Sequence, residues 1–91
     1  MSRAVTDRGR SLMKVLTETP VYQVKREVEE MTAKEAREIW SHLEPFFPGV
    51  CSRVSIRKRN ESSFVLMKKM DLIRLKAEEA DKLDRGELRP Q

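Results

Sequence analysis

The sequence predicts a small α+β domain of three to four helices with one antiparallel β-hairpin. Two patterns predict this class. Apolar residues recur at helical spacing in the first half of the chain, and from residue 50 the spacing changes to two, which is typical of a half-buried strand. With 91 residues the chain has room for one hydrophobic core. We therefore expect a single domain over residues 1–91, with frayed ends at 1–10 and 86–91.

The first half of the chain predicts two helices in succession. Residues 11–18 carry apolar side chains on one side and predict a short first helix. Thr19 and Pro20 then favour a helix start, because threonine caps helices and proline fits the first helical position. The apolar residues that follow are spaced three or four apart, which is the pattern of one helix face. They are Val21, Val24, Val28 and Met31.

A capping box predicts where the next helix begins. Thr32 and Glu35 have the spacing at which the threonine oxygen accepts an amide proton and the glutamate reaches back to the cap. An apolar stripe follows, and Pro45 is expected to end the helix because proline removes a backbone donor. We expect Phe46 and Phe47 in the loop that follows. The stripe consists of Ala36, Ile39, Trp40 and Leu43.

The hairpin is predicted from alternating residues. From residue 50, one row of side chains would face the core and the other, with its arginines, would face water. The inner row is Val50, Ser52, Val54 and Ile56, and the outer row is Cys51, Arg53, Ser55 and Arg57. Residues 59–62 supply turn formers, and residues 64–67 predict a second strand rich in aromatic and β-branched types. A last helix is expected from Asp71 to the stop at Gly86.

An alternative fold is mostly α, with a long C-terminal helix that begins at Ser63 and ends at Leu83. Its support is a second row of apolar residues at helical spacing, formed by Leu66, Met70, Ile73, Ala77 and Ala80. That helix would leave residues 50–56 as an unpaired strand, or residues 45–62 as one long loop. Such loops are uncommon in compact domains, so the hairpin is preferred.

The supply of chemically special residues excludes most enzyme classes. The chain has one histidine, His42, and one cysteine, Cys51, whereas a catalytic centre needs a nucleophile, a base and a group that orients them. A structural zinc site needs about four such ligands. The three glycines are isolated and form no phosphate-binding loop. We expect no enzyme, no metal and no cofactor.

The charge distribution predicts a partner. Residues 1–49 are neutral, residues 50–75 carry a net charge of +5, and residues 76–91 carry −1. Cations on a hairpin can follow a phosphate backbone, so we expect a non-enzymatic protein that binds DNA or RNA with little sequence specificity. The expected contacts are Arg53, Arg57, Lys58, Arg59, Lys68 and Lys69.

A second functional class is a subunit or adaptor of a protein complex. Trp40, Phe46 and Phe47 are the candidate contact residues, with Met67 and Met70 as a second apolar surface. Aromatic residues and methionine are enriched at protein interfaces. Both classes are compatible with a homo-oligomer.

The sequence also predicts a compartment. A single cysteine forms no internal disulfide, and no apolar run approaches the length of a membrane span, so we expect an intracellular, cytoplasmic protein without a membrane partner. Arginines near the N-terminus give it some likeness to an organelle import signal. Asp7 and Gly9 argue against that reading.

Overall fold

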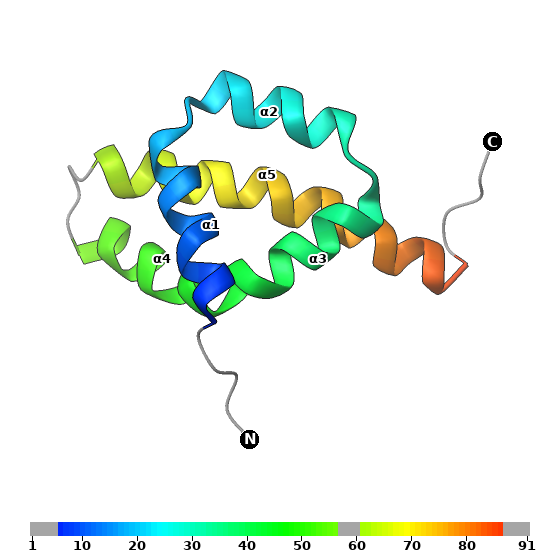
Figure 1. Ribbon diagram of the computed structural model, residues 1–91. Coiled ribbons are helices and arrows are strands. Elements are labelled where there is room, and N and C mark those ends of the chain that lie inside the picture. The colour runs from blue at the N-terminus through cyan, green and yellow to red at the C-terminus, as the bar shows by residue number, and fades with distance from the viewer. Residues whose placement is uncertain (1–5, 57–60, 87–91) are drawn as a thin grey trace.

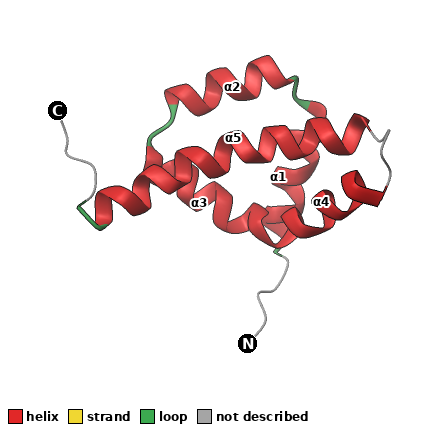
Figure 2. Ribbon diagram, turned by 180° about the vertical axis from the view of Figure 1, so that it is seen from behind, coloured by secondary structure: helices red, strands yellow, loops and turns green. Residues whose placement is uncertain are grey.

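The computed structural model describes residues 6–56 and 61–86, and its regular structure in these ranges is helical throughout (Figures 1 and 2). The elements are α1 (Asp7–Glu18), α2 (Val21–Glu30), α3 (Ala33–Leu43), the 3-10 helix η1 (Glu44–Phe46), α4 (Phe47–Ile56) and α5 (Glu61–Asp84). No strand occurs in the described ranges, so the predicted α+β class is wrong. The mostly α alternative, with its long last helix, fits the structure.

The long helix α5 lies at the centre of the arrangement. It packs against α2 on one side and against α3 and α4 on the other, while α1 crosses near its first half (Figures 1 and 2). One face of α5 is buried along nearly its whole length, at intervals of three and four residues that match the helical repeat. The buried apolar residues of this face are Leu66, Met70, Ile73, Ala77 and Ala80.

Helix α4 replaces the predicted first strand. Val50 and Val54 alternate with polar residues as a strand would, but they are also four apart and therefore lie on one face of a helix. Phe47 and Cys51 complete this face, and all four side chains are buried or half-buried. Ser52, which the strand would have turned inward, is exposed. The tertiary arrangement thus follows the helical period.

The long loop that counted against the helical alternative does not exist. Pro45 does end α3, but the chain continues through η1 directly into α4. The predicted second strand, residues 64–67, forms the second turn of α5 instead.

The helix ends follow from local hydrogen bonds. Thr6 caps α1, since its Oγ1 accepts from the Gly9 amide at 3.0 Å, and α1 therefore begins at Asp7 instead of Ser11. Thr19 does not cap α2. Its Oγ1 donates to the Val15 carbonyl at 2.6 Å and so helps to end α1.

The capping box of α3 is confirmed. The Thr32 amide donates to Glu35 Oε1 at 2.8 Å, and the Glu35 amide donates to Thr32 Oγ1 at 3.1 Å. This reciprocal pair satisfies two amides that have no partner within the helix. It fixes the start of α3, which positions the aromatic residues at the helix's other end.

The substitution Gly9→Ala is expected to destabilise the fold. An added Cβ would lie 2.6 Å from the His42 carbonyl oxygen and 3.1 Å from Phe46 Cε2, so α1 would have to move away from the end of α3. Overpacking of this kind costs about 1–3 kcal/mol, measurable by urea unfolding. Gly49→Ala is the matched control, because its Cβ would meet nothing within 4 Å, and alanine favours a helix by up to about 1 kcal/mol. Equal stability of the two variants would contradict this close approach.

Candidate functional site

Three of the six predicted nucleic-acid contacts lie in the described residues, and one of these three is buried. Arg57, Lys58 and Arg59 lie outside the described residues. Arg53 and Lys68 are exposed, on α4 and α5 respectively, whereas Lys69 is buried. The basic hairpin that was expected to align them is replaced by two helices.

Lys69 holds two helices together. Its side chain is only 4% exposed, and Nζ donates to the Leu16 carbonyl at 2.8 Å and to the Thr17 carbonyl at 3.2 Å. Carbonyl groups in the last turn of a helix lack partners within the helix, so Lys69 closes the end of α1. Burial lowers the pKa of Lys69 below its usual 10.5. This lysine is therefore a structural residue, and it is not free to bind phosphate.

Arg53 and Lys68 are the two predicted contact residues that are both described and exposed. Lys68 Nζ lies 5.5 Å from the ring centroid of Phe64, one turn earlier on α5. In the described parts of the chain, no carboxylate lies within ion-pair distance of Arg53 or Lys68. These two side chains are free to meet an anionic partner.

Two of the three predicted aromatic contact residues meet each other. Trp40 of α3 and Phe47 of α4 pack edge to face, with ring centroids 5.3 Å apart and planes at 72°. Phe46 is not part of this pair. Its ring lies against α1 next to Gly9 and packs on the core. Met70 is fully buried and Met67 packs against the core, so the predicted methionine surface is core instead.

The aromatic pair lines a cleft between α3, the start of α4 and the second half of α5. The cleft has a volume of about 570 Å³. Trp40, Phe47 and Pro48 form its apolar part. The remaining lining residues come from both sides: Arg37, Ser41 and Glu44 on the α3 side, and Arg74, Ala77, Glu78 and Asp81 on α5.

Two arginines line the cleft, and each is held in place by two carboxylates. Arg37 of α3 pairs through Nε with Asp81 at 3.3 Å and through Nη1 with Asp84 at 2.6 Å. These two ion pairs connect α3 to the last turns of α5. Arg37 could not be predicted from the sequence, because its carboxylate partners are more than forty positions away in the chain.

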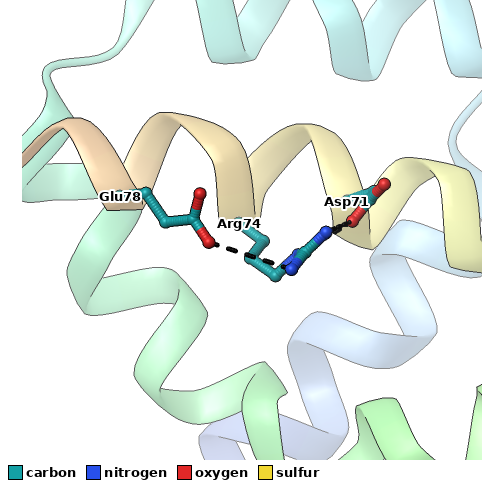
Figure 3. Close-up of polar contacts among 3 residues, drawn as sticks. All are labelled: Asp71, Arg74 and Glu78. Carbon is teal, nitrogen blue, oxygen red and sulfur yellow. Dashed lines mark hydrogen bonds and ion pairs between the residues drawn. The ribbon is translucent and has the colours of Figure 1, made fainter.

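Arg74 lies along α5 between two carboxylates (Figure 3). Its Nε donates to Asp71 Oδ1 at 2.8 Å, and its Nη1 lies 3.8 Å from Glu78 Oε2. The guanidinium carbon is 5.6 Å from the Phe47 ring centroid, so Arg74 also covers the aromatic part of the cleft. The carboxylates three residues before and four residues after Arg74 were a signal for this arrangement in the sequence.

The single histidine of the chain connects two helices, and no metal-binding cluster occurs in the described residues. His42 Nδ1 lies 3.3 Å from Thr6 Oγ1, and this contact joins α3 to the cap of α1. Residues 6–56 and 61–86 hold no group of three or more histidine, cysteine or acidic side chains that could bind a metal ion. None of the described helices is both long and apolar enough to cross a membrane.

The substitution Lys69→Met is expected to destabilise the protein by about 1–3 kcal/mol, because it removes the hydrogen bonds to the Leu16 carbonyl, which is buried, and to the partly buried Thr17 carbonyl. Lys68→Met is the matched control, since the adjacent Lys68 is exposed and its contact with Phe64 contributes at most about 1 kcal/mol. Urea unfolding of both variants measures the difference.

The pH dependence is a second measurement of the same prediction. Because the pKa of Lys69 is lowered in the folded state, the unfolded chain binds more protons just below pH 10.5, and folding stability rises with pH in that window. The stability of the wild type relative to Lys69→Met should therefore increase as the pH approaches 10.5. A flat difference would contradict the buried ammonium.

The described residues thus leave two kinds of exposed functional group. One is the cleft around Trp40 and Phe47, and the other consists of the exposed cations Arg53 on α4 and Lys68 on α5. Comparison of the chain with protein-family models, with curated proteins and with solved structures finds no match.

Proposed function

We propose that this chain is a protein-interaction module that binds a peptide segment of a partner in the cleft between α3, α4 and α5. The observation that carries the proposal is the edge-to-face pair of Trp40 and Phe47, which lines an open hollow of about 570 Å³. Hollows of this size bind small ligands or a few peptide side chains. Tryptophan and arginine are also the residues that contribute most to binding energy at protein interfaces.

The rigidity of the cleft supports the proposal. Arg37 and Arg74 are each held by two carboxylates, and Trp40 is held by Phe47. Binding is weakened by the entropy of ordering side chains at an interface, about 0.5–1.5 kcal/mol for each one. A cleft whose long side chains are already ordered avoids much of this cost.

Selection from a random peptide library on the immobilised protein tests this function. We expect the enriched peptides to change the fluorescence of Trp40, the only tryptophan of the chain. Phe47→Ala should weaken their binding by about tenfold or more, since it removes the partner ring of Trp40. Calorimetric titration measures the dissociation constants.

Two further variants control for folding. Ser41→Tyr fills the cleft from α3 without removing any core residue, and it should also weaken binding. Phe64→Ala removes an exposed aromatic ring outside the cleft, and it should leave binding unchanged. Peptides that bind the Phe47 and Ser41 variants as tightly as the wild type would refute the cleft as the binding site.

Nucleic-acid binding is a second candidate function. The observation that favours it is the net charge of +5 over residues 50–75, together with the exposure of Arg53 and Lys68. Lys69 contributes nothing to such a surface, and Arg74 is neutralised by Asp71 and Glu78. The candidate contact is therefore smaller than the sequence predicted.

Charge reversal tests this second candidate. The double variant Arg53→Glu with Lys68→Glu should weaken binding to a short DNA or RNA oligonucleotide. The slope of log affinity against log salt should become shallower by about 2, the effect of losing two phosphate contacts. Lys25→Glu with Arg26→Glu, on exposed positions of α2, changes the net charge equally and serves as the control. Equal losses in both double variants would show a purely general charge effect and refute a specific surface.

A further inference from the structure

Carboxylates outnumber cations around the cleft. Arg37 pairs with Asp81 and Asp84, and Arg74 pairs with Asp71 and Glu78. Each guanidinium group is thus matched by two carboxylates. In the lining of the cleft itself three carboxylates, Glu44, Glu78 and Asp81, stand against these two arginines. The four acidic side chains that pair with the arginines are at least two-fifths exposed, so a bound partner can reach them.

This arrangement excludes an anionic ligand and favours a cationic one. Two arginines beside one hollow would suit a phosphate or a carboxylate if their donors were unoccupied. Here the donors already face carboxylates at 2.6 to 3.8 Å, and an anion would be repelled by those groups. A lysine or arginine side chain would instead gain charge-assisted hydrogen bonds to the carboxylates. Electrostatic complementarity therefore selects a basic partner.

The charged and apolar parts of the cleft lie side by side. Glu78 and Asp81, three residues apart on α5, both line the cleft, and residues three apart lie on the same face of a helix. The apolar part of the cleft, formed by Trp40, Phe47 and Pro48, is the place for an uncharged side chain of the same peptide.

We infer that the partner of the cleft is a basic segment of another protein that carries a lysine or arginine close to an apolar residue. This inference rests on the proposed function and specifies the chemistry of its ligand. The cation meets Glu78 and Asp81, the carboxylates of α5 that line the cleft, and the apolar side chain packs on Trp40 and Phe47.

Three synthetic hexapeptides test the inference. The first has arginine at both ends, leucine at its two central positions and glycine elsewhere; the second has glutamate in place of arginine; the third has alanine in place of leucine. We expect the first to bind at least tenfold more tightly than either of the others, by calorimetry and by the fluorescence of Trp40. Its affinity should fall when the salt concentration is raised from 50 to 500 mM, because partly exposed ion pairs are screened.

Variants of α5 identify the carboxylates that bind the arginine side chains of the peptide. Glu78→Gln combined with Asp81→Asn should reduce the preference for the arginine peptide over the glutamate peptide by about tenfold, while the protein remains folded by circular dichroism. Glu79→Gln is the matched control, because Glu79 is exposed on the same helix but does not line the cleft. A preference that survives the double variant would overturn the assignment.

The outcomes separate this inference from the proposed function. If library-selected peptides bind the cleft but carry no lysine or arginine, the function holds and the basic partner is wrong. If no peptide from the library or the panel changes the fluorescence of Trp40, the function itself fails. If the protein alone self-associates with rising concentration, and Phe47→Ala and added salt both abolish this, the occupant is a second copy and the inferred partner is wrong.

Discussion

The burial of one face of α5 is the constraint on which the rest of the structure depends. Met70, Ile73, Ala77 and Ala80 are almost completely buried, and α2, α3 and α4 all pack against this helix. A chain of 91 residues buries only about two-thirds of its unfolded surface. Packing the neighbouring helices against one long helix lets a short chain form a single continuous core. Small residues in the second half of the buried face let α3 approach closely, and this approach brings Arg37 within reach of Asp81 and Asp84.

The helices with local signals were predictable from the sequence. The spacing of Val21, Val24 and Val28 and the capping box at Thr32 depend on residues within a few positions of each other, and both predictions are confirmed. The region from Val50 onward was not predictable from the pattern used, because residues four apart satisfy both a strand and a helix. The helical face formed by Phe47, Val50, Cys51 and Val54 resolves the ambiguity once phenylalanine and cysteine are counted as apolar.

The candidate site was predictable in part for the same reason. Trp40 and Phe47 are unusual residues and stood out in the sequence, but the split between Phe47 in the cleft and Phe46 against α1 depends on the turn of η1. The roles of the cations depend on contacts between distant segments. Two adjacent lysines on α5 differ in exposure, since Lys69 is buried and Lys68 is exposed. A count of charges along the chain does not distinguish them.

Net charge is therefore a poor guide to the partner of this protein. Of the cations that the sequence assigned to a basic surface, Lys69 is used to close α1, and Arg74, in the same segment, is neutralised beside the cleft. The chain is positive overall, at +4, yet the hollow with the best geometry for binding is lined by a surplus of carboxylates. Short-range contacts act where ligands bind, whereas the field of the whole molecule is screened within about 8–10 Å at physiological salt. A basic peptide is consequently favoured at the cleft of a basic protein.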